Sequence, residues 1–548
     1  MSPSPDNRLQ PLQTAELKIL PKPQTIPAGA GFRNPRPCGL KTNMPATKAG
    51  ASKKSTPRES GLAFWMQRVL EECDRAGENF AADPVHDLRV ALRRCRSMAD
   101  GLMAMDPDPA WKQMKKAGKR LFSSLGELRD AQVMAEWVVR LGEPGDPVSS
   151  TLLQFLSDRE TQLKHEAAQA LQEFDRKQWK KWGASLARRA ARIRAGSLIF
   201  KHLALERWTE AYALHGAALR NRSQLAFHRL RIGLKRFRYI VENFLPEQHK
   251  GWIGDLKELQ DLLGEVHDLD VLWATALQIN AFPDNEARSR WHARIVKERA
   301  HRIESYRSKM LRKTSLWQVW RAELPAGRQI ESAALSRLKL WASLLDPDFR
   351  HSIHVARLAL QLCDGLPARK QLEDHHAKQQ RAILQLAALL HDVGRSKEEK
   401  NHHKATHRLI RQLTPPLGWS EEQLRMAGIV ARYHRGALPG AGQKALAGLS
   451  ASQRPAALRL AGILRLANAF DADHAGRIQR LEVHERNGVL AIAAQGYSPR
   501  DRMAEGIAAA RHLLETVYRR PVMVKPLVVP APSHGETSSR TRRPRAQS

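Results

Sequence analysis

A cationic pattern with helical spacing occurs twice in this chain, as HDLRVALRRCR from His86 to Arg96 and as HRLRIGLKRFR from His228 to Arg238. In each copy a histidine is followed by basic residues at offsets three, seven, eight and ten. At about 100° per residue, offsets zero, three, seven and ten lie within about 80° of arc, so four basic side chains share one helical face. Like charges four residues apart each destabilise a helix by about 0.2 to 0.5 kcal/mol, and interleaved glutamates are missing. The pattern therefore predicts two helices that bind an anion.

A second pair of similar strings follows the first pair. LGELRDAQVM starts at Leu125, and LGEVHDLDVL starts at Leu263. The two cationic strings start 142 residues apart and these two strings start 138 residues apart, in the same order. Such nearly equal spacing indicates that one helical unit occurs twice, with a small change in loop length.

Residues 61–325 resemble the CHAD domain, an α-helical module named for its conserved histidines and associated with inorganic polyphosphate. The resemblance rests on two H-x-x-R-x-x-x-[RK]-R-x-R strings, each followed by L-G-E-x-x-D. It implies a duplicated four-helix-bundle fold, in which two bundles are related by a pseudo-twofold axis and both cationic helices line a basic channel. The residues that we expect to bind polyphosphate are His86, Arg89, Arg93, Arg94, Arg96, Lys116, Lys119, Arg120, Arg129, His228, Arg231, Lys235, Arg236, Arg238 and Lys257.

The aspartates of the L-G-E-x-x-D strings, Asp130 and Asp268, are expected to hold basic side chains through ion pairs. Arginine can chelate phosphate oxygens with two parallel N–H groups, whereas lysine acts as a point charge.

The net charge favours a polyanionic partner. Lysine and arginine number 90 against 56 acidic residues, which gives a charge of +34 and an isoelectric point near 10.5. Inorganic polyphosphate, free or in granules, is the expected partner. Nucleic acid is an alternative, although aromatic residues make up only 6% of the chain and the cationic strings offer little beyond Phe237 and Tyr239 for base stacking.

Composition also bears on the compartment. The four cysteines are scattered without a C-x-x-C motif, as suits a reducing environment, and no apolar run of about 18 residues or secretory signal is found. We therefore expect a cytoplasmic protein without membrane insertion, associated with polyphosphate granules, and a homodimer is one alternative for its assembly.

The chain divides into five expected segments. Residues 1–57 form a disordered leader, 61–325 the duplicated helical domain and 335–475 a second all-α domain. Residues 476–528 form a small α+β appendage with a hairpin at Leu481 to Ala494, a helix at Pro499 to Tyr518 and a strand at Val522 to Lys525. Residues 529–548 form a disordered basic tail.

A second group of reactive residues lies between Asp346 and His474. The string LQLAALLHDVG ends an apolar helix with adjacent His391 and Asp392, whose imidazole and carboxylate can converge on one divalent ion. Such an ion lowers the pKa of bound water and polarises a phosphoryl oxygen, as hydrolysis of phosphoesters or phosphoanhydrides requires.

Residues 335–527 resemble the HD superfamily, and more closely the C-terminal HD region of the exopolyphosphatase and guanosine pentaphosphate phosphatase (Ppx/GppA) family. The strings that carry the resemblance are HSIHVARLALQLCDGL, LAALLHDVGR, NHHKATHRLI, VARYHRGALP and LAGILRLANAFDADH. It implies a site for a divalent metal (Mn, Mg or Fe) with Asp392 as the catalytic residue. The implied metal ligands are His351, His391, Asp392, His403 and His434, with His354 and His402 as further candidates.

The chain departs from this family pattern at two positions. Ala405 stands where the family often has a histidine, and Asn468 stands where many HD proteins have their last metal-binding aspartate. Asp471 follows Asn468 by nearly one helical turn and could replace it. The glycine loop of the family's actin-like catalytic domain is not found, so we do not expect a conventional exopolyphosphatase.

Three hypotheses follow. In the first, the helical half binds polyphosphate and the HD half is regulatory or dimerising. In the second, the HD half is a metal-dependent phosphohydrolase that acts on polyphosphate or a phosphorylated nucleotide. In the third, the chain binds nucleic acid.

Overall fold

The computed structural model describes residues 61–311, 315–367, 374–440 and 443–527. The expected leader and basic tail lie outside these residues, apart from the boundaries of the described part. The described chain is mainly α-helical with one small sheet near its C-terminal end, so the predicted fold class is confirmed. No helix among the described residues is both long and apolar enough to cross a bilayer. The domain boundaries stay predictions.

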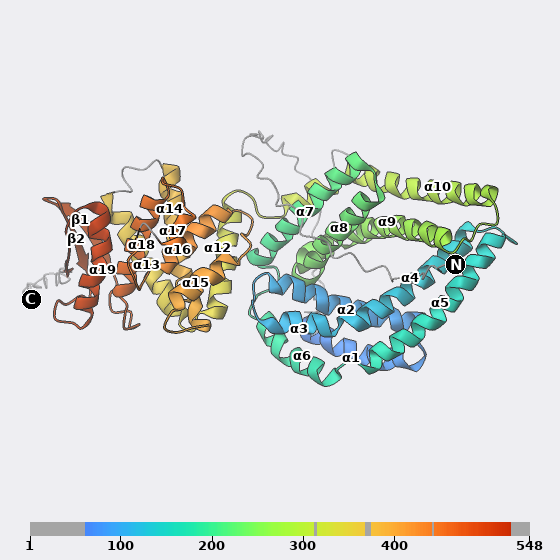
Figure 1. Ribbon diagram of the computed structural model, residues 1–548, viewed down its shortest axis with the longest axis horizontal. Helices are drawn as coiled ribbons and strands as arrows, with labels where there is room; N and C mark the ends of the chain where they lie inside the picture. The colour runs from blue at the N-terminus through green and yellow to red at the C-terminus, as the bar shows by residue number, and fades with distance from the viewer. Residues whose placement is uncertain (1–60, 312–314, 368–373, 441–442, 528–548) are drawn as a thin grey trace, which may run out of the picture. The chain divides into compact units, whose positions relative to one another are not determined.

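The first half of the duplicated region is built from six helices, which Figure 1 shows in blue to teal. They are α1 (Leu62–Asn79), α2 (Ala82–Met103), α3 (Pro109–Ala117), α4 (Lys119–Leu141), α5 (Pro147–Gln172) and α6 (Arg176–Ala190). Helix α2 carries the first cationic string, and its opposite face is buried through residues such as Leu88, Leu92 and Cys95. Apolar burial on one face thus turns the cationic residues to the other.

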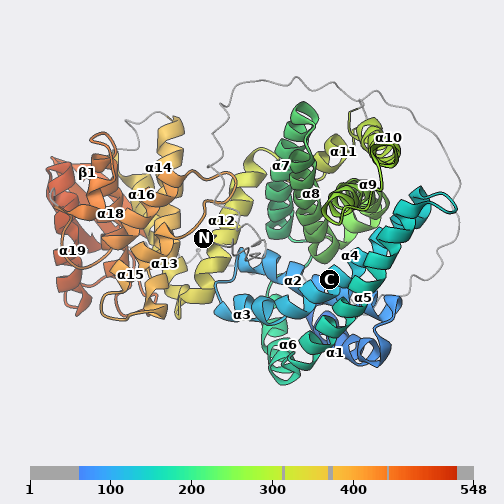
Figure 2. The same cartoon turned by 45° about the vertical axis from the view of Figure 1, so that its right-hand side comes forward.

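The second half contains α7 (Leu198–Asn221), α8 (Gln224–Phe244), α9 (Pro246–Gln278), α10 (Asn285–Met310) and α11 (Leu316–Ala322). Helix α8 carries the second cationic string, and it begins at a Ser223 cap whose hydroxyl accepts a hydrogen bond from Ala226 N at 3.2 Å. The two halves meet where α2 packs against α8 and α4 packs against α9 (Figures 1 and 2). The cationic helices of the two repeats are therefore neighbours.

The C-terminal part begins with α12 (Arg328–Leu345) and α13 (Phe349–Gly365). It continues through α14 (Asp374–Leu390), the 3-10 turn η2 (Val393–Ser396), α15 (His402–Arg411), α16 (Glu421–Arg432), α17 (Lys444–Ala447) and α18 (Arg454–Ala469). Helices α13, α14, α16 and α18 pack around a separate apolar core that includes Leu384, Val430 and Leu464.

The small sheet lies at the C-terminal end, as the sequence predicts. Strand β1 (Leu481–Arg486) pairs antiparallel with β2 (Val489–Ala494), and β2 pairs in parallel with β3 (Val522–Pro526) after helix α19 (Met503–Tyr518). Asn487 and Gly488 join the hairpin with positive φ angles of 49° and 75°, which glycine and asparagine tolerate best. Helix α19 packs against α18 and contacts β3.

Candidate anion cavity and candidate metal cluster

A cavity of about 350 Å³ lies between the two repeats. Its lining comes from α2, α4, α8 and α9, which are the two cationic helices and the two helices that carry the L-G-E strings. The lining residues are Arg89, Phe122, Ser123, Gly126, Glu127, Asp130, Met134, Arg231, Lys235, His267, Asp268 and Val271.

Four basic side chains from α2 and α8 gather at this cavity without a carboxylate partner. Arg89, Arg231 and Lys235 line it, and Arg93 lies close enough to Lys235 to lower its pKa. In the described part of the chain, none of the four forms an ion pair within 4.0 Å. Arg89 donates instead to the backbone oxygen of Leu125 at 2.7 Å. We call these four residues the cationic cluster.

The electrostatics of the cluster show that the charges repel one another. Burial lowers the pKa of Lys235 to about 8, and the positive charges of Arg231, Arg93 and Arg89 lower it further. Burial is likewise the main cause that lowers the pKa of Arg89. An anion in the cavity would relieve both effects, since it would replace lost hydration and balance the charge.

The L-G-E string has a physical role beside Arg89. A Cβ atom at Gly126 would lie 3.2 Å from Arg89 Nη1, so glycine leaves room for the guanidinium that bonds the neighbouring Leu125 oxygen. The cationic string and the L-G-E string are thus parts of one site.

The remaining arginines of the cationic strings are used elsewhere. Arg94 forms an ion pair with Glu242 and donates to Asn243 Oδ1 at 3.1 Å, and Arg238 lies 3.9 Å from the same glutamate. Arg236 forms an ion pair with Glu210 at 2.9 Å. Arg94 and Arg236 occupy the offset of eight, which lies outside the shared face of the helix.

Other predicted polyphosphate residues lie outside the cavity lining. Arg96 donates to the backbone oxygen of Lys115 at 2.6 Å, Arg129 pairs with Glu136 at 3.2 Å, and Arg120 pairs with Glu173. His228 lies beside the cavity, with its ring centroid 4.9 Å from that of His267. The exposed residues of the predicted set are His86, Lys116, Lys119 and Lys257.

Asp130 and Asp268 differ from expectation. Neither forms an ion pair within 4.0 Å among the described residues, and both line the cavity. Burial raises the pKa of Asp268 to about 6, and the charge of Asp130 raises it further against the opposing effect of Arg231. The two carboxylates therefore add unneutralised negative charge to a cationic cavity instead of fixing single arginines.

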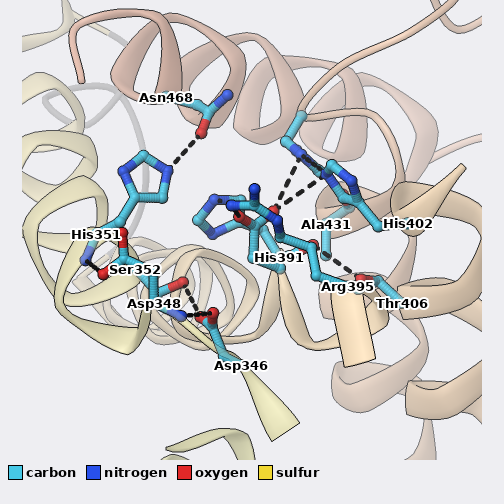
Figure 3. Close-up of polar contacts among 12 residues, drawn as sticks. Asp346, Asp348, His351, Ser352, His391, Arg395, His402, Thr406, Ala431 and Asn468 are labelled. Carbon is cyan, nitrogen blue, oxygen red and sulfur yellow. Dashed lines mark hydrogen bonds and ion pairs between the residues drawn. The ribbon is translucent and has the colours of Figure 1, made fainter. Parts of the chain in front are cut away.

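The histidine cluster of the C-terminal part is assembled at the junction of α14, η2 and α15. A Cβ at Gly394 would lie 2.1 Å from His402 O and 2.5 Å from Thr406 N, so only glycine allows α15 to pack this closely. Thr406 fixes the contact, because its hydroxyl donates to His391 O at 2.8 Å and accepts from Gly394 N at 3.0 Å. Figure 3 shows how this brings His402 toward the His391 and Asp392 pair.

Three imidazoles converge on one carboxylate oxygen. The Nε2 atoms of His391, His402 and His434 lie 3.5, 3.2 and 3.6 Å from Oδ1 of Asp392. Each ring donates through Nδ1 to a backbone oxygen three residues earlier, at 2.7 Å in all three cases. The three Nε2 atoms therefore present lone pairs, and those of His402 and His434 lie only 3.2 Å apart.

This arrangement fits a divalent cation. Lone pairs that face one another and a carboxylate repel unless a positive charge lies between them, and Nε2 of His391 is a buried atom without a hydrogen bond in the described chain. Nitrogen and oxygen donors of this kind suit zinc, iron and manganese. Ligand atoms fall within 4.8 Å of one another in two groups, His351 with His391 and Asp392, and Asp392 with His402 and His434.

His351 is oriented by two neighbours on its far side. Its Nδ1 lies 2.8 Å from Asp471 Oδ2, and its Nε2 lies 3.1 Å from Asn468 Oδ1. Burial lowers the pKa of His351, but the hydrogen bond to Asp471 and the charge of Asp392 outweigh burial and raise it. Asp471 thus points inward and holds His351 rather than joining either group of ligand atoms (Figure 3 labels His351 and Asn468).

Not every predicted ligand joins the cluster. His351, His391, Asp392 and His434 are brought together, and His402 joins them, whereas His403 and His354 belong to neither group. Adjacent histidines point in different directions from a helix, so the sequence string could not decide between His402 and His403. Ala405 is buried on the same helix.

Comparison with known families agrees with both halves of the chain. Residues 66–277 match the CHAD domain family. The chain contains a CHAD domain. A crystal structure of the CHAD domain from the plant Ricinus communis is similar to this chain at 20% identity and a TM-score of 0.35, covering 48% of this chain and 88% of that one. Residues 337–492 match domain III of the Ppx/GppA phosphatases. None of the curated proteins compared with the chain matches it.

The cavity of the CHAD domain contains residues that sequence reasoning missed. His267, Phe122 and Met134 line it, although they lie in or near the L-G-E strings rather than in the cationic strings. The pairing of each cationic string with an L-G-E string was the available signal, because two strings that repeat with the same spacing can serve one site. The arginines near the histidine cluster carried no such signal.

Proposed function

We propose that the chain binds inorganic polyphosphate through the cavity of its CHAD domain. The observation that carries the proposal is the cationic cluster, in which four positive side chains from two repeats gather without an acidic partner in the described chain. Grouping such charges destabilises the fold unless an anion is bound. A phosphate chain supplies closely spaced negative charges that one cavity can hold.

The aromatic residues favour phosphate over nucleic-acid bases. The ring of Phe122 is covered by Arg89 and Arg96, whose guanidinium carbons lie 5.8 and 5.1 Å from its centroid. The ring of Tyr239 is covered by Arg93 and Lys235, at 5.7 and 5.9 Å. Faces that already contact cations are not free to stack on bases, and sequence-independent single-strand binders rely on such stacking.

The test is a competition titration of the whole chain with long-chain polyphosphate, single-stranded RNA and duplex DNA at near-physiological salt. We expect polyphosphate to bind most tightly, with an affinity that falls steeply as salt increases. Replacing Arg231 or Lys235 by alanine should weaken binding about tenfold or more, because each removes one uncompensated charge-assisted contact.

Arg236→Ala is the matched control, since Arg236 belongs to the same cationic string but pairs with Glu210 at the surface. It should change the affinity by about twofold or less. Equal losses for Arg231→Ala and Arg236→Ala would show that binding depends on general charge, and tighter binding of nucleic acid would contradict the ligand assignment.

A second candidate function is metal-dependent phosphohydrolysis in the C-terminal part. We infer that this part is an HD-type domain in which His391, Asp392, His402 and His434 would hold the ion. A bound divalent ion supplies a polarised water and a Lewis acid for phosphoryl chemistry. Asp392 suits the role of an anionic ligand, because the three surrounding imidazoles overcome the effect of burial and hold its pKa far below its usual range. The metal content of the purified chain tests this candidate.

A further inference from the structure

A second cavity, of about 470 Å³, opens beside the histidine cluster. One wall holds His351, Asp392, His402 and His434, and another holds Arg435 and Arg465. The third wall is formed by α19. We propose that this cavity binds a small phosphorylated organic molecule of the nucleoside diphosphate class, with its phosphates at Arg435 and Arg465 and its uncharged body against α19.

The charge of the lining selects an anion. Arg395, Arg435 and Arg465 face the cavity together with a single carboxylate, that of Asp392. Arg395 neutralises that carboxylate, since its Nη1 lies 3.2 Å from Asp392 Oδ2 (Figure 3 labels Arg395). Arg435 and Arg465 form no ion pair within 4.0 Å in the described part of the chain. Two positive charges are therefore left over, which matches a pyrophosphate group better than a single carboxylate.

Arg465 is positioned for this role by its backbone contacts. Its Nη2 donates to Gly436 O at 2.6 Å and its Nη1 lies 3.5 Å from Tyr433 O, so the guanidinium is anchored by neutral acceptors. Burial lowers the pKa of Arg465, and no nearby charge opposes that effect. A partly buried guanidinium that only carbonyls hold in place is costly, and a bound phosphate would reduce the cost.

The size and the third wall indicate more than an inorganic ion. The volume lies in the range of about 300 to 1,000 Å³ that is typical of small-molecule sites. On α19 the wall consists of Gly506, Ala509 and Ala510, and α18 adds Ala469. A Cβ atom at Gly506 would have nothing within 4 Å, so the space in front of this helix is open. Side chains no larger than methyl leave room for an organic body between α19 and the arginines.

This inference uses other residues and another ligand than polyphosphate binding by the CHAD domain, so the two can fail separately. The experiment uses the whole chain with Arg89→Ala and Arg231→Ala, which removes two charges from the CHAD cavity. Calorimetric titration of this background with ADP, inorganic pyrophosphate and adenosine separates the phosphate and organic contributions. We expect ADP to bind more tightly than pyrophosphate and adenosine to bind weakly. A polyphosphate titration of the same samples reports on the CHAD cavity alone.

Two sets of substitutions locate the ligand. Arg465→Ala should weaken both ADP and pyrophosphate about tenfold or more, and Arg465→Lys, which keeps the charge without the planar fork, should recover part of the loss. Gly506→Phe should weaken ADP about tenfold while leaving pyrophosphate unchanged, because the ring would fill the space for the organic body. Gly506→Ala is the matched control and should bind ADP as the background does.

The outcomes decide the proposal. Loss of ADP binding in Gly506→Phe with pyrophosphate retained supports a phosphorylated organic ligand in this cavity. Equal affinities for ADP and pyrophosphate, both indifferent to Gly506→Phe, would leave only inorganic anion binding and would overturn the assigned ligand class. ADP binding that is unchanged in the folded Arg465→Ala and Arg465→Lys variants would overturn the site itself.

Discussion

Replacing Asp268 by asparagine should make the CHAD domain more stable and strengthen its binding of polyphosphate. Asp268 lines the cavity without an ion pair in the described chain, and burial raises the pKa of its carboxyl group from 3.8 to about 6. A raised pKa means that the folded state disfavours the ionised form. Asparagine has nearly the same shape but carries no charge at any pH.

The magnitude follows from the pKa difference. A shift of about 2 units corresponds to about 3 kcal/mol, because each unit is worth about 1.4 kcal/mol. The folded pKa lies above the unfolded one, so the cost is absent below about pH 4, grows between about pH 4 and 6 and is complete above that range. Asparagine removes the cost, and a gain of about 2 to 3 kcal/mol at about pH 8 corresponds to a rise of about 4 to 12 °C in Tm for a domain of this size.

The assay is thermal unfolding of the wild type and of Asp268→Asn across this pH range, followed by polyphosphate titration at about pH 7.5. We expect the difference in Tm to vanish near about pH 4 and to be largest above about pH 6. Removing one negative charge from the cavity should also tighten polyphosphate binding by about threefold to tenfold.

Asp270→Asn provides the control on the same helix. Asp270 accepts from Arg299 Nε at 2.9 Å, so its loss should destabilise the domain or leave it unchanged. If Asp268→Asn lowered the Tm at about pH 8 as Asp270→Asn does, attraction to Arg231 would outweigh burial and the reasoning would be refuted.

Two further predictions concern the C-terminal part. Gly394→Ala should destabilise it by about 3 kcal/mol or prevent its folding, because the added methyl would collide with the backbone of α15; unfolding at the wild-type temperature would contradict this. Adding Mn²⁺ to metal-free chain should raise the Tm of the wild type but not of His434→Ala, while a chelator reverses the effect; equal shifts in both would remove His434 from the ligands.

The sequence predicted the cavity because its signal was periodic. The offsets zero, three, seven and ten of each cationic string describe one helical face, and the structure places Arg89, Arg231 and Lys235 on the cavity wall. Offset eight lies off this face, and the structure gives Arg94 and Arg236 to surface or interhelical carboxylates instead. Those partners, Glu242 and Glu210, lie outside any motif, so no pattern could reveal which arginines stay unpaired.

The histidine cluster shows the limit of motif reasoning more sharply. His391 and Asp392 were predictable because they are adjacent at the end of an apolar helix, but the choice between His402 and His403 depends on the close approach of α15 to η2. That approach is set by Gly394, whose lack of a side chain is legible only once its neighbours are known.

Arg435 and Arg465 illustrate a different kind of blindness. Arginine is common in this chain, and neither residue repeats, so the sequence gives them no distinction from a solvated charge. Their distinction is the absence of an acidic partner within the described structure, combined with a cavity in front of them. Charge that lacks a partner is a property of the folded arrangement, and it identifies both cavities of this protein. In the CHAD cavity the sequence supplies the charges in a repeat, whereas in the C-terminal cavity the fold alone collects them.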